Sequence, residues 1–397
     1  MGLDTENHWL NRKRFLTYTR VFFLIYLILA IGVVAHSNLL QPDGFPLYFD
    51  FAVFWSASKL ALSGFPAQAY DLHQLHGVLH ALQPDIAEGS YGWFYPPSYL
   101  LLISQLARLP YLSAYLVFMS ASLMAFAYVI RKIGGSNQAL WALAGFSGVW
   151  DNLLTGQNGF LTGAIAGGSL LLLDKRPVIA GILAGVLSIK PQLAVLFPLA
   201  FIASKSWKAL LAAGFSSVLS IFLASAIFGF DSLSAWLHSL NLARAFLEVG
   251  GEKYWMRMPT IFASAHLLGA PIPLSYFLHL IVSCFVAASV WLVWRHSQEP
   301  MLRNAALTAG TLLISPYILI YDLTWLALPM AWLARFSMKR GWLRWEREAL
   351  IFAWFVPLIM LIMGKIIPVQ IGFLGALVLL AAAGRRVSQA MRENTNA

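Results

Sequence analysis

The chain has 397 residues, of which 59% are hydrophobic and only 11% are charged, and its formal net charge is +10. Soluble domains carry about 25% charged residues, so this composition excludes a soluble globular protein and indicates an all-α polytopic membrane protein whose spans are helices. The basic residues lie in short clusters between apolar runs, which is the positive-inside pattern rather than a nucleic-acid-binding face. The single cysteine, Cys284, excludes an intrachain disulfide.

The N-terminal region predicts an uncleaved membrane anchor. Basic residues from Arg12 to Arg20 precede an apolar run, and no small-residue cleavage site follows it. Residues 20–37 are therefore the first predicted span, with its basic end in the cytoplasm.

Residues 38–96 form a first predicted extracytoplasmic loop, because Lys59 is their only strong base. Within the loop, residues 51–63 and 69–82 predict two short helices that lie at the membrane interface. Asp50 is placed to cap the first of these helices, and Gly64 is placed to end it.

The remaining apolar runs predict a bundle of about 11 to 13 membrane segments within one domain, residues 1–384. Residues 97–108 are expected to be short or re-entrant, because a full crossing there would place Arg131 and Lys132 outside. A second extracytoplasmic region is expected at residues 229–271, and residues 385–397 predict an unstructured cytoplasmic tail. The other expected spans are 111–130, 138–150, 159–173, 178–189, 193–203, 210–228, 273–294, 305–320, 323–334, 349–363 and 367–383.

This topology places most of the polar motifs on the extracytoplasmic side, whereas the cytoplasmic side receives short basic turns. Any chemistry is therefore predicted outside. The candidate residues on that side are Asp50, Tyr95, Gln157, Asn158, Lys190, Gln192, Tyr317, Tyr321 and Asp322.

The charged and amide candidates Asp50, Lys190, Asp322, Gln157 and Asn158 have structural alternatives. Asp50 could be a general base with a raised pKa, or only a helix cap. Lys190 could bind the phosphate of a lipid carrier, or be a snorkelling lysine at a helix end. Asp322 could orient a sugar hydroxyl, pair with Lys190 or cap a helix. Gln157 and Asn158 could bind hydroxyls or simply form a glycine-flanked turn.

Metal and nucleotide chemistry find little support in the sequence. His73, His76 and His80 share one helical face and could bind a divalent metal with Asp71, although such histidines more often face solvent, and no metal or other cofactor is predicted. The chain contains no Asp-x-Asp pair and no glycine-rich phosphate loop. In the second external region, Arg257 and its aromatic neighbours could bind a glycolipid headgroup or form an interfacial belt.

An ordered set of short motifs resembles glycosyltransferase family 87, a branch of the C superfamily of membrane glycosyltransferases. The motifs occur in the family's order between about residues 45 and 335. They are Asp50-Phe51, Ala69-Tyr70-Asp71, Tyr95-Pro96-Pro97, Gly156-Gln157-Asn158, Ile189-Lys190-Pro191-Gln192, Ser315-Pro316-Tyr317 and Tyr321-Asp322.

The resemblance implies a helical bundle with interfacial helices in the first loop and Asp50 as the catalytic base. It implies transfer of a hexose, as in polyprenol-phosphate-mannose-dependent α-mannosyltransferases, from a polyprenyl-phosphate sugar to a lipid or glycan acceptor. The expected location is the bacterial inner membrane, among membrane lipids, with the site on the periplasmic face and without a nucleic-acid partner. The alternatives are a secondary transporter or flippase, and a lipid-binding scaffold without catalysis.

Overall fold

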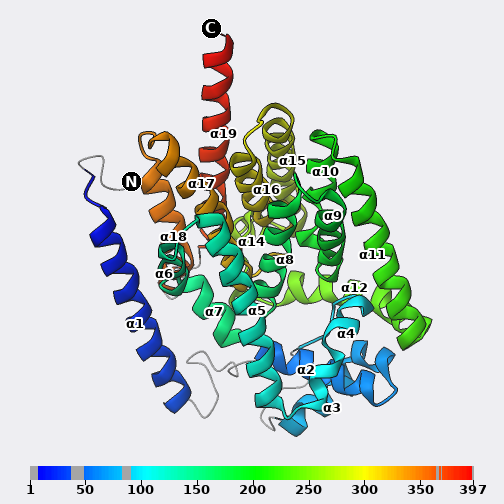
Figure 1. Cartoon of the computed structure of the whole chain (residues 1–397). Coiled ribbons are helices and arrows are strands. Elements are labelled where there is room, and N and C mark those ends of the chain that lie inside the picture. Colours follow the sequence, from blue (N-terminus) through cyan, green and yellow to red (C-terminus); the bar gives the residue numbers. More distant parts are fainter. Residues whose placement is uncertain (1–7, 37–48, 83–90, 364–365, 368, 396–397) are drawn as a thin grey trace.

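The computed structural model describes residues 8–36, 49–82, 91–363, 366–367 and 369–395. In this part of the chain the regular structure is helical and contains no strand, which confirms the predicted all-α class. Figure 1 shows long helices packed side by side, with shorter helices gathered at one end of the bundle.

The first half of the chain forms mostly short helices around two long ones. They are α1 (Arg12–His36), α2 (Phe49–Leu62), η1 (Pro66–Tyr70), α3 (Leu72–Leu82), α4 (Pro97–Ile103), η2 (Ser104–Arg108), α5 (Tyr111–Gly134), α6 (Gln138–Ala144), α7 (Ser147–Thr155), α8 (Gly159–Leu172), α9 (Pro177–Val186) and η3 (Leu187–Ile189), where η marks a 3-10 helix.

The second half contains more of the long helices. It comprises η4 (Pro191–Leu193), α10 (Leu196–Ala203), α11 (Trp207–Phe228), α12 (Phe230–Val249), α13 (Glu252–Trp255), α14 (Ile261–Leu267), α15 (Ile272–His296), α16 (Pro300–Ile314), η5 (Ile320–Leu326), α17 (Ala327–Arg340), α18 (Glu346–Met363) and α19 (Phe373–Thr395).

Among the described residues, four helices are long and apolar enough to cross a membrane: α1, α5, α11 and α15. Three shorter apolar segments, 159–172, 177–189 and 191–203, accompany them. These findings confirm a polytopic membrane protein, whereas the total of 11 to 13 segments stays a prediction. Residues 97–108 form only the short helices α4 and η2, so they are short as expected.

Two predictions about chain segments were wrong. The expected span 138–150 is broken into α6 and α7 by the extended backbone of Phe146 (φ −83°, ψ 123°). The Trp150 indole donates a hydrogen bond of 2.8 Å to the Ala144 carbonyl at the end of α6. The expected unstructured tail is helical, because α19 continues without interruption to Thr395.

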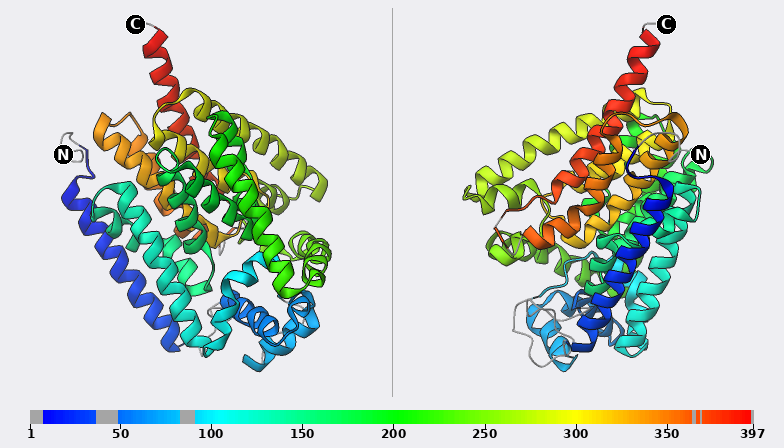
Figure 2. Two further views of the ribbon diagram at one scale, coloured as in Figure 1. Left: turned by 45° about the vertical axis from the view of Figure 1, so that its right-hand side comes forward. Right: turned by 90° about the vertical axis from the view of Figure 1, so that its left-hand side faces the viewer.

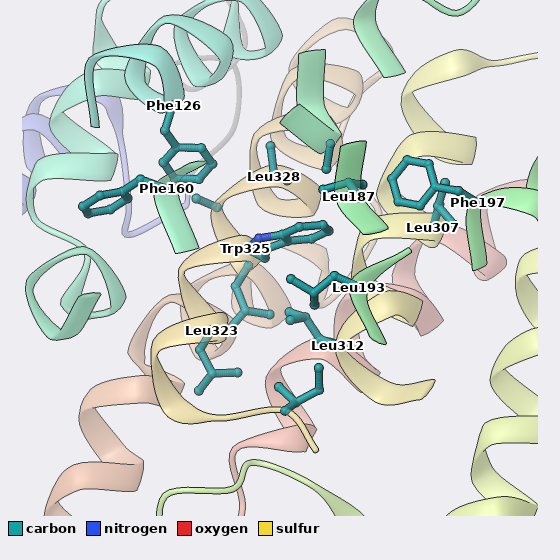
Figure 3. Close-up of a cluster of buried hydrophobic side chains, with 14 of the residues drawn as sticks. Phe126, Phe160, Leu187, Leu193, Phe197, Leu307, Leu312, Leu323, Trp325 and Leu328 are labelled. Carbon is teal, nitrogen blue, oxygen red and sulfur yellow. The ribbon is translucent and has the colours of Figure 1, made fainter. Parts of the chain in front are cut away.

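The 3-10 helix η5 lies at the centre of the bundle and is surrounded by other helices (Figure 3). Figure 3 shows Trp325 of η5 among leucine and phenylalanine side chains from several helices. Its indole donates a hydrogen bond of 3.0 Å to Thr162 of α8, and the Thr324 hydroxyl donates one of 2.6 Å to the Gly148 carbonyl of α7. These two hydrogen bonds between buried groups fix η5 relative to α7 and α8.

The bundle has two chemically different ends. Figure 2 shows the start of α1 and the end of α19 toward one end, and α2 and α3 at the opposite end. Basic residues cluster at the end with the termini, as in the last turns of α5 and α17, which contain Arg131, Lys132, Lys339 and Arg340. At the opposite end α12 packs against η1 and α4, so the two predicted external regions meet there.

Candidate active site

A cavity of about 460 Å³ lies between the two predicted external regions. Eight of the ten candidate residues line it, although they come from six separate stretches of the chain. The eight residues are Asp50, Tyr95, Gln157, Lys190, Gln192, Arg257, Tyr317 and Tyr321. The other two candidates, Asn158 and Asp322, are fully buried behind this wall.

Asp50 lies in the first turn of α2, which begins at Phe49. It is therefore not the residue that precedes the helix, and the predicted cap role was wrong. The helix ends at Leu62, and Gly64 stops it in the following turn as expected, since the positive φ of +88° there suits glycine.

The position of α2 is set by the residue after Asp50. Phe51 is fully buried and its ring contacts those of Tyr111, Tyr115 and Phe118 at centroid distances of 5.6–5.7 Å. Packing of this kind fixes the first turn of α2, so that the Asp50 carboxyl lies at the wall of the cavity.

Burial raises the pKa of the Asp50 carboxyl to about 6, which is the largest effect on it. The charges of Arg257 and Lys190 and a hydrogen bond with Gln157 lower this pKa, whereas the charge of Asp322 raises it. A carboxyl with a pKa near 6 is mostly ionised at pH 7 and is a stronger base than an ordinary aspartate. The group therefore has the properties of a general base.

The turn that contains Gln157 joins two walls of the cavity. The Tyr95 hydroxyl donates a hydrogen bond of 3.2 Å to Gln157 Oε1, and the backbone N–H of Asn158 donates one of 2.9 Å to the same oxygen. The Tyr95 carbonyl in turn accepts a hydrogen bond of 3.0 Å from the Tyr70 hydroxyl. These hydrogen bonds hold Gln157 in place beside Asp50. Asn158 is buried in the turn and contributes its backbone N–H to Gln157.

Lys190 and Asp322 form a buried ion pair. Lys190 Nζ lies 2.5 Å from Asp322 Oδ1, and the two residues are 2% and 0% exposed. The ammonium also lies 4.7 Å from the centroid of the Tyr321 ring. The pairing of Asp322 with Lys190 is thus confirmed among the alternatives, and a snorkelling lysine was wrong.

The second carboxylate oxygen of Asp322 accepts a hydrogen bond of 3.1 Å from the backbone N–H of Leu319. Asp322 is the third residue of η5, and through this hydrogen bond it also stabilises the start of that helix. It does not occupy the cap position that the sequence suggested. Because both of its oxygens are engaged and the residue is fully buried, Asp322 does not reach the cavity as a sugar ligand would.

Arg257 connects the second external region to the cavity. Its side chain lines the wall, and its carbonyl accepts a hydrogen bond of 2.8 Å from the backbone N–H of Ile320 in η5. The neighbouring Tyr254 also lines the cavity. These residues belong to the cavity rather than to an interfacial belt alone.

A hydrogen-bonded chain links the candidate residue Tyr317 to the second external region through Tyr276, which the sequence pattern did not indicate. The Tyr317 and Tyr276 hydroxyls lie 2.7 Å apart, and Tyr276 donates a hydrogen bond of 2.8 Å to Glu248, which Arg244 also binds at 2.6 Å. No local pattern could have found this chain, because Tyr276 is on α15 and Glu248 on α12.

Within the part of the chain that the structure describes, no group of three or more His, Cys, Asp or Glu side chains is arranged to hold a metal ion. His76 and His80 lie near each other on α3, with ring centroids 5.8 Å apart, but neither lines the cavity.

The lining of the cavity combines polar and apolar side chains. Carboxylate, guanidinium, amide and phenol groups line it together with Val53, Phe54, Phe94, Leu240 and Leu247. A site of this composition accommodates an amphipathic molecule with a polar headgroup and an apolar chain.

A family model for glycosyltransferase family 87 matches residues 93–316, which is more than half of the chain. A search of curated proteins and a search of solved structures each return no match. The matched range contains Tyr95, Gln157, Lys190 and Arg257, whereas Asp50 lies before it.

Proposed function

This chain belongs to glycosyltransferase family 87, and we propose that it transfers a hexose, mannose in the first instance, from a polyprenyl-phosphate sugar to a lipid or glycan acceptor. The observation that supports this most strongly is the meeting of Asp50, Arg257 and Lys190, which is paired with the buried Asp322, around one cavity that is also lined by apolar side chains. The cavity offers a base, cations and room for a lipid chain.

In the proposed reaction Asp50 acts as the general base. An acceptor hydroxyl gives its proton to the Asp50 carboxylate while its oxygen forms a bond to the anomeric carbon of the donor sugar. The bond between that carbon and the phosphate oxygen breaks, and polyprenyl phosphate leaves with the electron pair. Direct displacement inverts the anomeric centre, so a β-linked donor gives an α-linked product.

Arg257 is the better candidate to stabilise the departing phosphate. Both Arg257 and Lys190 line the cavity, and Lys190 forms a buried ion pair with Asp322 at 2.5 Å. A guanidinium also matches phosphate geometry through parallel N–H donors. Lys190 then contributes mainly by holding η5, and with it Tyr321, at the site.

The extracytoplasmic face is the proposed side of the reaction. The cavity is at the end of the bundle that holds α2 and α3, and basic clusters lie toward the opposite end. Because Lys and Arg are retained on the cytoplasmic side, this arrangement favours an active site facing the periplasm of a bacterial inner membrane. A secondary transporter would instead place its polar residues near the midplane.

The first test is a transfer assay with purified protein in lipid vesicles. It combines polyprenyl-phosphate mannose with a lipid extract of the host and measures release of polyprenyl phosphate. Release that requires both the extract and Asp50 is expected, with Asp50→Asn lowering the rate at least 100-fold, because loss of a general base typically costs about 10²–10⁴ in rate.

The unfolding temperature at pH 8 serves as the folding control for the Asp50→Asn variant. Because the pKa of Asp50 is raised in the folded state, the stabilising contribution of this group is lost as pH rises through about 6. At pH 8 the variant should therefore unfold at no lower temperature than the wild type. Full transfer by a folded Asp50→Asn protein would refute the assignment of Asp50 as the base. Absence of transfer by the folded wild-type protein with every lipid-linked sugar would favour a secondary transporter.

A further inference from the structure

A second cavity, of about 470 Å³, lies at the end of the bundle opposite the candidate active site. Helix α1 lines one part of it, and α5, α6, α17 and α18 line the rest. Figure 1 shows α1 standing beside the bundle next to α6 and α18. Because α1 is long and apolar enough to span a membrane and most of its side chains are exposed, this cavity borders the lipid.

The wall of this cavity is almost entirely apolar. The Thr19 hydroxyl, one of its few polar groups, is hydrogen-bonded to the Phe15 carbonyl of its own helix at 3.0 Å. A polar solute would find few partners inside, whereas a hydrocarbon chain would lose no hydrogen bonds on entering. The apolar lining includes Trp9, Phe15, Phe22, Ala142, Met330, Ala331, Ala334, Ile351 and Trp354.

One charged side chain lines the cavity and is buried. Arg347, at the start of α18, is 4% exposed, and its guanidinium lies 4.8 Å from the centroid of the Trp342 ring, which also lines the cavity. A guanidinium that lies against an aromatic ring is a planar cation of the kind that suits phosphate recognition.

The surroundings of the cavity carry an excess of positive charge. Arg12, Lys13 and Arg14 precede its lining residue Phe15, and Lys339, Arg340 and Arg344 flank Trp342. Two carboxylates lie nearby: Glu346 binds Arg386 at 2.8 Å, and Glu348 binds His8 at 3.2 Å and interacts with the charge of Arg347. The basic side chains outnumber them. The local field therefore favours an anionic headgroup.

We propose that this cavity binds one anionic phospholipid, with an acyl chain between α1 and α18 and its phosphate beside Arg347. The volume lies within the range of about 300–1,000 Å³ that is usual for small-molecule sites. The bound lipid would fill the space between α1 and the bundle and so hold the anchor helix in place. This site is separate from the candidate active site and does not depend on the proposed reaction.

The test is native mass spectrometry of the purified full chain in detergent, after exposure to phosphatidylglycerol or to phosphatidylcholine. The wild type should retain one phosphatidylglycerol per chain. Ala331→Phe, which fills the cavity, should lower this occupancy at least tenfold, whereas Ala288→Phe, at an exposed position on α15, should leave it unchanged. Arg347→Gln should abolish the preference for phosphatidylglycerol, and Arg347→Lys should preserve part of it.

Other outcomes would overturn the proposal. Equal retention of the two phospholipids by the wild type would remove the role of charge, and unchanged occupancy in a folded Ala331→Phe protein would place the lipid elsewhere. Displacement of phosphatidylglycerol by a polyprenyl phosphate, in a manner sensitive to Ala331→Phe, would identify a different occupant. The Ala331 variant keeps the test valid even if Arg347→Gln fails to fold.

Discussion

At the scale of single residues, the chemistry of the candidate site depends on the surroundings of Asp50. Burial raises the pKa of this carboxyl to about 6, and Arg257 is the strongest of the influences that lower it. The same arginine is the proposed partner of the leaving phosphate, so one cation would act on both the base and the leaving group.

The pH dependence of transfer should therefore follow the ionisation of Asp50. Because the base must be ionised, kcat/KM should rise with pH through about 6 and level off above it. Removing the charge in Arg257→Gln should move this rise to higher pH, whereas Arg257→Lys should move it less. The measurement is kcat/KM between pH 5 and pH 9. A rise at the same pH in all three proteins would show that Arg257 does not act on Asp50.

The Lys190–Asp322 pair should contribute to stability more than to proton transfer. Lys190→Met would leave the fully buried Asp322 carboxylate without its cation, which typically destabilises a protein by about 3–5 kcal/mol. Asp322→Asn in the same protein should recover much of this loss, because an amide oxygen still accepts from the Leu319 N–H. Thermal unfolding in detergent measures both effects, and a Lys190→Met protein as stable as the wild type would contradict the pairing.

At the scale of elements, the position of α2 depends on the turn between α7 and α8. Gly156 in that turn has a φ of +73°, and a Cβ added there would lie 2.7 Å from the Phe51 Cβ. Because Phe51 follows Asp50 directly, this contact couples the turn to the candidate base.

Gly156→Ala should therefore reduce transfer as well as stability. The left-handed conformation alone costs a non-glycine residue about 1–2 kcal/mol, and relief of the contact with Phe51 requires α2 to move. Gly214→Ala is the matched control, because a Cβ at that position in α11 meets nothing within 4 Å. Transfer rates and unfolding temperatures of both variants check this, and a Gly156→Ala protein with wild-type rates would mean that α2 tolerates the shift.

At the scale of the whole molecule, the two ends of the bundle should face opposite sides of the membrane. In a Cys284→Ala background, Ser63→Cys lies beside the end of α2 and Ser136→Cys lies after α5, both at exposed positions. A membrane-impermeant maleimide should label Ser63→Cys in cells with a permeable outer layer and label Ser136→Cys only after lysis. The reverse pattern would place the candidate active site in the cytoplasm.

The sequence by itself determined the class of the protein and much of its helical framework. Composition alone required membrane helices, and apolar runs located α5, α8, α11 and α15 to within a few residues, because hydropathy is a property of each local segment. The motifs also indicated most of the cavity residues, since the alternation of predicted spans assigned them to one side.

Only the tertiary structure decided how those residues act on one another. The choice of Asp322 as the partner of Lys190, the raised pKa of Asp50 and the Tyr317–Tyr276–Glu248 chain all join segments that are far apart in sequence. Charge interactions depend on the distance between groups and on burial, and a linear pattern contains neither of these quantities.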